Sequence, residues 1–219
     1  MKEFNPAWEG KIIFTEQNQH LYTGLSIDQL ISLSGIKGYM NDTTEEKPVF
    51  DIDGLYPFLK FSIKYKEVTL FRDFDFEDRI IYNISFDTLK KREGVGTRVL
   101  RSQVSAAREI GFEEILCTAL GYYNSKYNGY VTWGKLGYQM YKSGEITDFL
   151  KLMEEGRSQV NPNGYLYVDT LHQLLLNTDG TEYWTVRGSK WSGVFKLTPN
   201  SESLSVLNNY LTRKGLERI

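Results

Sequence analysis

The most informative segment of this sequence is Leu89-Lys90-Lys91-Arg92-Glu93-Gly94-Val95-Gly96-Thr97. It follows a strand-like run over residues 79–86 and precedes a helical pattern over residues 95–110. Glycine carries no Cβ, so Gly94 and Gly96 allow the backbone to turn sharply and to approach a ligand closely. The helix that follows would direct its free N–H groups and its positive dipole end at this turn. The segment therefore predicts either an anion site suited to phosphate or a plain connection between a strand and a helix.

The chain before this segment has the patterns of one helix and several strands. We expect a strand over residues 11–14 and a helix that follows the N-cap Ser26 and continues to Ile36. Apolar and polar residues then alternate with period two, which predicts antiparallel strands over residues 58–65, 68–74 and 80–86. The acidic residues before the last of these strands are expected at a solvated hairpin end, since a calcium loop would need a glycine and a spaced terminal Glu.

Beyond the glycine turn the clearest pattern is an amphipathic helix over residues 95–110. Its apolar stripe, which includes Val95, Val99 and Ile110, is typical of a helix packed on a sheet. A buried strand over residues 113–120 is expected next. Weaker patterns predict helices over residues 126–136, 146–155, 165–176 and 201–211, a turn at Thr178-Asp179-Gly180, and one or two short strands within residues 183–195.

Composition limits the kinds of partner and the compartment. The net charge of −2 and the lack of a basic arm give no reason to expect a nucleic-acid partner. The single cysteine, Cys117, and the two histidines, His20 and His172, argue against a metal centre. The sequence opens without an apolar signal region and contains no apolar run of membrane-spanning length. We therefore expect a cytoplasmic protein without a membrane partner, and the oligomeric state stays open.

Two motifs together resemble a known family. The first is Lys91-Arg92-Glu93-Gly94-Val95-Gly96 with Leu100 behind it, and the second is Trp133-Gly134-Lys135-Leu136-Gly137-Tyr138. Their sequence and their spacing resemble the GNAT superfamily of acyl-CoA N-acyltransferases. The resemblance implies an α/β (α+β) fold, with a mixed, mostly antiparallel central sheet and flanking helices, over residues 1–141. Residues 142–219 would be a helical C-terminal extension packed on this domain, because they carry too many apolar side chains to remain a free tail.

The resemblance also implies a reaction and a set of site residues. Acetyl-CoA would be the acyl donor, and an amine of unidentified kind, a small molecule or a protein, would be the acceptor. The main chain around residues 85–87, Phe86 included, would polarise the thioester carbonyl. Asp87 would take up the proton of the attacking amine, with Asp51 and Asp53 as alternatives. Arg98 and Arg101 would either meet the outer phosphate or remain solvated. The cofactor contacts would come from Lys91, Arg92, Gly94, Val95, Gly96, Thr97 and Trp133.

The chain departs from the family pattern at two positions. Lys91 stands where the family usually has Gln or Arg, and Trp133 stands where it usually has a tyrosine that protonates the departing thiolate. An indole N–H donates a hydrogen bond but does not release its proton near neutral pH. Tyr130 lies three residues earlier, on nearly the same helix face, and is the replacement that we expect. The alternatives are thus a variant active site and a binding fold without catalysis.

Overall fold

The structure is a computed structural model that describes residues 11–14, 25–40, 48–55, 57–89, 93–160, 164 and 166–219. The chain divides into two compact units, Met1–Glu113 and Glu114–Ile219. Both contain strands and helices, and strand pairing within them is mostly antiparallel. The division after Glu113 falls within residues 1–141, which the sequence predicts as the first domain. The predicted domain boundary at residue 141 stays a prediction. None of the helices in the described ranges has both the length and the apolar character needed to cross a membrane.

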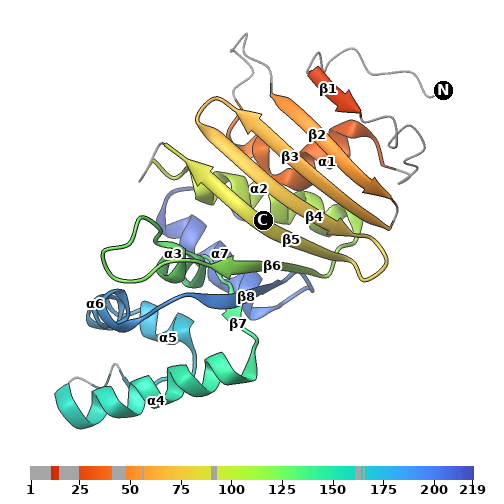
Figure 1. Ribbon diagram of the computed structural model, residues 1–219. Helices are drawn as coiled ribbons and strands as arrows, with labels where there is room; N and C mark the ends of the chain where they lie inside the picture. The colour runs from red at the N-terminus through yellow and green to blue at the C-terminus, as the bar shows by residue number, and fades with distance from the viewer. Residues whose placement is uncertain are drawn as a thin grey trace. The chain divides into compact units, whose positions relative to one another are not determined.

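The first unit is built on a mixed sheet (Figure 1). Among the described strands of this unit, the first pair of neighbours is parallel and the other three pairs are antiparallel. In spatial order the strands are β1 (Lys11–Phe14), β2 (Val49–Leu55), β3 (Phe58–Tyr65), β4 (Val68–Asp75) and β5 (Ile80–Thr88). The strands predicted from the alternating pattern are confirmed. Strand β2, which follows the polar residues 41–47, was not predicted from the sequence.

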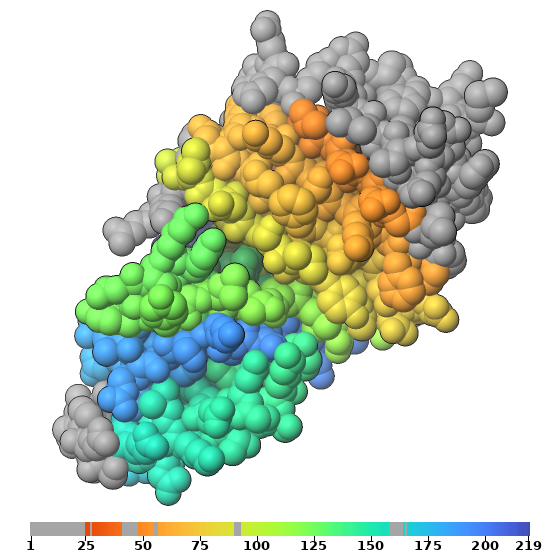
Figure 2. Space-filling view, viewed as in Figure 1, coloured from red at the N-terminus to blue at the C-terminus, as the bar shows by residue number. Residues whose placement is uncertain are grey.

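Two helices and a 3₁₀ turn cover one face of this sheet (Figure 1). They are α1 (Ile27–Ser34), η2 (Ile36–Gly38) and α2 (Val95–Ile110). The covered face carries the buried alternate residues of β3, namely Leu59, Phe61, Ile63 and Tyr65. Figure 2 views the opposite face, where Phe71 and Ile84 are about half exposed. The observed bounds of α2 are those predicted from its apolar stripe.

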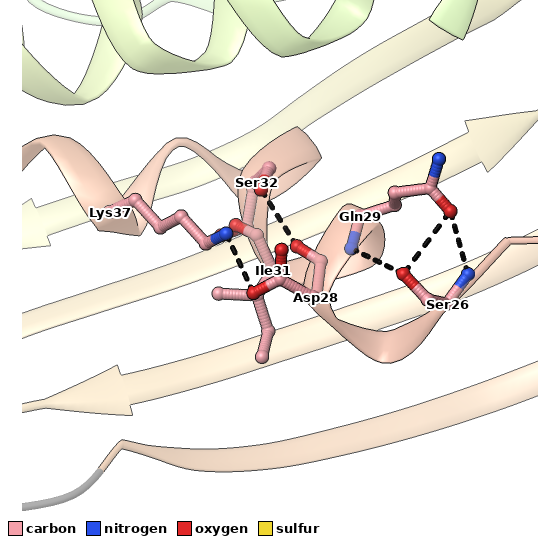
Figure 3. A network of polar contacts seen from close by, with 7 residues as sticks. Ser26, Asp28, Gln29, Ile31, Ser32 and Lys37 are labelled. Atoms are coloured by element: carbon pink, nitrogen blue, oxygen red, sulfur yellow. Dashed lines mark hydrogen bonds and ion pairs between the residues drawn. The ribbon is translucent and has the colours of Figure 1, made fainter. Parts of the chain in front are cut away.

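Helix α1 begins and ends through local side-chain and backbone chemistry (Figure 3). The Ser26 hydroxyl accepts a hydrogen bond from the N–H of Gln29, and the Gln29 side chain accepts one from the N–H of Ser26. The predicted N-cap is therefore confirmed. The helix ends before Ile36, because Gly35 adopts the left-handed conformation with φ 84°. An ion pair of 2.7 Å between Lys37 and Asp28 then connects η2 to α1.

Two glycines allow this segment to lie directly on the backbone of α2. A Cβ at Gly35 would be 2.3 Å from the carbonyl oxygen of Val99, and a Cβ at Gly38 would be 2.2 Å from that of Arg98. Real Cβ atoms do not approach oxygen so closely, so only glycine fits at both positions. The close contact fixes the first half of α2, which carries the predicted phosphate site at its start.

The second unit contains a small antiparallel sheet and five helices within its described residues. In spatial order the strands are β6 (Glu114–Ala119), β8 (Trp191–Lys196) and β7 (Gln139–Met140). The helices are α3 (Gly129–Lys135), α4 (Ser143–Val160), α5 (Leu171–Leu175), α6 (Thr178–Arg187) and α7 (Glu202–Arg213). The predicted strand over residues 113–120 and the predicted helices over residues 146–155 and 201–211 are confirmed, with ends shifted by a few residues.

The predicted helix over residues 126–136 is also confirmed, and it begins at Gly129. The helix predicted over residues 165–176 is confirmed only in its later part, because it begins after Thr170, whose side chain caps it. Two other predictions for this unit are wrong. The predicted turn Thr178-Asp179-Gly180 is instead the first turn of α6, and this helix also contains Trp184, which was predicted in a strand. The Asn177 side chain accepts the N–H of Asp179 and so starts a helix where Asp-Gly suggested a turn.

Candidate functional site

The predicted phosphate site lies at the start of α2 in the first unit. Gly94 is the N-cap and adopts the left-handed conformation with φ 72°. Having no side chain, it cannot accept a hydrogen bond from the first-turn N–H groups, as the caps of α1, α5, α6 and α7 do. These donors and the positive end of a 16-residue helix are therefore available to an anion.

A cation lies beside this helix start. The Arg98 guanidinium donates a hydrogen bond of 3.0 Å from Nη1 to the carbonyl of Glu93, the residue before the N-cap. The same nitrogen would be 3.6 Å from a Cβ at Gly94. The guanidinium is thus held over the turn, where it adds positive charge to that of the helix dipole. Lys91 and Arg92, which the sequence assigns to the same site, lie outside the described residues.

The structure brings Phe86 and Gly96 together. A Cβ at Gly96 would lie 3.5 Å from Cε1 of the Phe86 ring, which is ordinary van der Waals contact. The small residue therefore leaves the backbone of the first turn open beside the ring. Val95 and Thr97 are both buried, so the polar groups that they can offer a ligand are those of the main chain. Asp87 is exposed on β5, opposite Thr69 of β4.

An irregularity interrupts β5 just before these residues. Phe71 pairs with Ser85, and Arg72 pairs with Asn83, so Ile84 is an extra residue in β5. The bulge lies next to residues 85–87, the main chain that was predicted to polarise the thioester carbonyl. A bulge takes main-chain groups out of the regular ladder and can direct them at a ligand.

A buried arginine that was not predicted as a site residue stabilises this bulge through hydrogen bonds. Arg72 is 1% exposed, and its Nη1 donates to the carbonyl of Ser85 at 2.7 Å and to that of Phe71 at 3.0 Å. The alternation of β4 indicates that Arg72 is buried, because Arg72 falls between the inward-facing Leu70 and Phe74. A charged residue at an inward position of a strand indicates a special role, because burial of a charge is costly unless it is hydrogen-bonded.

The alternative bases do not come close to Asp87. Asp51 and Asp53 lie on β2, and β3 and β4 separate this strand from β5. Three strand spacings correspond to about 14 Å. The Asp53 side chain also accepts the N–H of Gly54 at 2.8 Å. Within the described part of the first unit, Asp87 is therefore the predicted base that lies on the strand leading to the turn.

Tyr130, the predicted proton donor, belongs to α3 in the second unit. Its side chain is 3% exposed, and its hydroxyl donates a hydrogen bond of 2.6 Å to the carbonyl of Thr185. Burial raises the pKa of this phenol above its ordinary value, and the nearby Tyr123 raises it further. The hydroxyl is thus protonated near neutral pH and is held by α6. It would have to leave this carbonyl in order to donate to a thiolate.

The main chain of Tyr130 is held as firmly as its side chain. Its carbonyl accepts the indole N–H of Trp184 at 2.9 Å and that of Trp191 at 2.8 Å. Trp133 is half-buried, and its ring packs edge-on against Tyr138 with centroids 5.3 Å apart. The two aromatic residues predicted to share one helix face therefore contact different neighbours within this unit.

The described residues contain no group of three or more His, Cys, Asp or Glu side chains placed to hold a metal ion. No protein-family model, no curated protein and no solved structure matches this chain.

Proposed function

We propose that this protein binds an acyl-CoA, with acetyl-CoA as the expected donor, and transfers the acyl group to an amine. The observation that carries the proposal is the open start of α2, where left-handed Gly94 provides no cap and Gly96 leaves the backbone accessible. Backbone N–H groups at a helix start are well suited to the pyrophosphate of CoA. The guanidinium of Arg98 above the turn adds to the attraction.

The proposed reaction is a direct transfer. The amine nitrogen attacks the thioester carbonyl carbon, the carbonyl oxygen becomes an oxyanion, and the C–S bond then breaks to release CoA as a thiolate. The ammonium proton passes to Asp87, directly or through water. A main-chain N–H released from the ladder by the bulge at Ile84 would stabilise the oxyanion. The Tyr130 phenol would protonate the thiolate, which requires it to exchange its hydrogen bond to Thr185.

A second function has its own supporting observation. The hydroxyl of Tyr130 is buried and bonded to the carbonyl of Thr185, and Trp133 occupies the position of the family's usual tyrosine. A protein with this arrangement and without another proton donor would bind CoA or a protein partner without transferring an acyl group. Such a module shares the cofactor site of the proposed enzyme and differs from it only in turnover.

Two measurements on the full chain separate these functions. Calorimetric titration with CoA and with acetyl-CoA tests the binding site, and release of the free CoA thiol in the presence of a panel of amines tests transfer. Binding together with amine-dependent thiol release would support the enzyme. Binding without thiol release would support the silent module. If neither CoA nor acetyl-CoA binds at millimolar concentration, both CoA-based functions are overturned.

A further inference from the structure

The second unit contains a cavity that is separate from the residues used in the proposed function. It has a volume of about 330 Å³ and lies between α4, the last turn of α6 and the start of β8. Hydrogen bonds from the main-chain N–H and the hydroxyl of Ser192 to the Glu145 carboxylate connect α4 to β8 beside it. In Figure 2 the turquoise surface of α4 accordingly lies next to the blue surface of the segment around β8.

Large aromatic side chains form the floor of the cavity. Phe149 of α4 packs edge-on against Trp184 of α6 with ring centroids 5.7 Å apart, and Trp191 of β8 completes the aromatic surface. Both indole N–H groups are bonded to the carbonyl of Tyr130, which fixes the orientation of the two rings. The rings are therefore fixed, but Phe149, Trp184 and Trp191 are only 2–3% exposed. The apolar surface that a ligand can reach comes from Met140 and Leu152, which are partly exposed and line the same cavity.

The side of the cavity formed by α4 is mainly acidic. Glu145, Asp148 and Glu155 line it, at helical spacings of three and seven residues that place them on one face. One cation, Lys151, lines the cavity from the same helix. Glu145 is occupied by Ser192, with distances of 2.8 Å to the main-chain nitrogen and 3.0 Å to the hydroxyl. Asp148 is exposed and forms no hydrogen bond or ion pair with the described residues, so its carboxylate is available to a ligand cation.

The opposite side of the cavity is basic. Arg187 and Lys190 line it, on the segment that joins α6 to β8. Gly188 allows this segment to lie against the floor, because a Cβ there would be 2.5 Å from the Trp184 ring. Arg187 and Lys190, like Asp148, form no ion pair within the described part of the chain. Opposite charges thus face one cavity without neutralising each other.

We propose that this cavity binds a small zwitterion of the amino-acid class that carries an apolar or aromatic group. The ligand's ammonium would bind Asp148, its carboxylate would bind Arg187 and Lys190, and its side chain would pack on Met140 and Leu152. The volume is at the lower end of the roughly 300–1,000 Å³ typical of small-molecule sites, which favours a single amino acid over a larger ligand such as CoA. This site goes beyond the proposed function and does not depend on it.

The test uses the full chain and three related probes. L-Phenylalanine carries both charges, phenethylamine lacks the carboxylate, and 3-phenylpropionate lacks the ammonium. Binding is followed by tryptophan fluorescence, excited at a wavelength that the probes do not absorb, because two of the chain's four tryptophans line the cavity. L-Phenylalanine is expected to saturate the signal, and each singly charged probe to bind about tenfold more weakly or worse. The same saturation is expected in the Gly96→Glu variant, in which CoA binding should fail.

Two variants assign the charges, each with a matched control. Arg187→Gln should reduce the preference for L-phenylalanine over phenethylamine, and Asp148→Asn should reduce the preference over 3-phenylpropionate. Lys196→Gln and Glu154→Gln change exposed charges on β8 and α4 that do not line the cavity, and they should leave both preferences unchanged. The proposal is overturned if neither L-phenylalanine nor L-leucine saturates the signal, if the three aromatic probes bind equally, or if the cavity variants behave like the controls.

Discussion

Asn83 of β5 and Gln103 of α2 bind each other through two hydrogen bonds, one in each direction and both 2.9 Å long. Asn83 is 7% exposed and Gln103 is fully buried. Each amide therefore satisfies the other in a place where water does not compete. The pair fixes α2 against β5 at the residue that precedes the bulge at Ile84.

Replacing one amide of this pair should lower the free energy of unfolding more than replacing both. Asn83→Leu leaves the Gln103 amide buried without its partner, and we expect a loss of about 1–3 kcal/mol in the free energy of unfolding. The double variant Asn83→Leu/Gln103→Leu should recover part of that loss, because neither amide of the pair is then left buried without the other. Urea denaturation of the two single variants and the double variant measures this. Strictly additive losses would show that the two amides do not act as a pair.

The start of α2 gives a prediction about cofactor binding. Gly96→Glu should abolish CoA binding, because it adds bulk and negative charge where the backbone must approach phosphate. Gly96→Ala is the matched control, since its Cβ makes only ordinary contact with Phe86 at 3.5 Å and carries no charge. Calorimetry with CoA measures both variants, and circular dichroism confirms that they are folded. A folded Gly96→Glu variant with normal affinity would remove this turn from the binding site.

The contact between η2 and α2 predicts an intolerance to one methyl group. Gly38→Ala would place a Cβ 2.2 Å from the backbone carbonyl of Arg98, so one of the two segments must move. We expect a loss of about 1–3 kcal/mol in the free energy of unfolding, as for other overpacked interiors. Gly144→Ala is the control, because nothing lies within 4 Å of its Cβ. Equal thermal unfolding midpoints for the two variants would contradict this account.

Tyr130→Phe distinguishes a structural phenol from a catalytic one. The variant loses the hydrogen bond to Thr185, which should reduce stability by about 1 kcal/mol in either case. If Tyr130 also protonates the thiolate, kcat should fall by about 100-fold or more with little change in the affinity for acetyl-CoA. Tyr122→Phe, which changes an exposed tyrosine, is the control. A stability loss with unchanged turnover would assign the phenol a purely structural role.

His172 predicts a pH dependence of stability. Burial lowers its pKa below the ordinary value of 6.5, and Arg213 lowers it too, while Glu202 and the carbonyl of Gly134 oppose the shift. Because the unfolded chain takes up the proton first, the stabilisation is complete above pH 6.5 and is lost as the pH falls toward the folded-state pKa. His172→Gln should flatten this dependence above about pH 5, where carboxylates remain ionised. Urea denaturation across this range measures the slope, and an unchanged slope would contradict the prediction.

The sequence predicted those parts of the fold that periodicity alone specifies. The strands β3 to β5 and the helix α2 have long, regular patterns, and their observed bounds lie close to the predicted ones. Local capping overrode composition at Asn177, where an Asp-Gly pair that suggests a turn begins a helix instead. The glycine has a packing role instead, because a Cβ at Gly180 would be 2.3 Å from the carbonyl oxygen of Leu174.

The features of the candidate sites also differ in whether the sequence could predict them. The turn at Gly94 could be predicted because strand, glycine turn and helix are consecutive in the sequence. Two hydrogen bonds could not be predicted, from Arg72 to Ser85 and from Tyr130 to Thr185. They join residues that are 13 and 55 positions apart in the sequence. The cavity in the second unit depends on side chains from four separate elements, β7, α4, α6 and β8. Its residues carry no motif that would set them apart from ordinary core and surface positions.

The carbonyl of Tyr130 also bears on how the second unit unfolds. It accepts hydrogen bonds from indoles that lie 54 and 61 residues further along the chain. If α3 detaches, both tryptophans lose their acceptor in the same event, and α6 and β8 both lose their hydrogen bond to α3. These three elements should therefore open as one cooperative block, with amide hydrogens that exchange at a common rate governed by a single opening free energy.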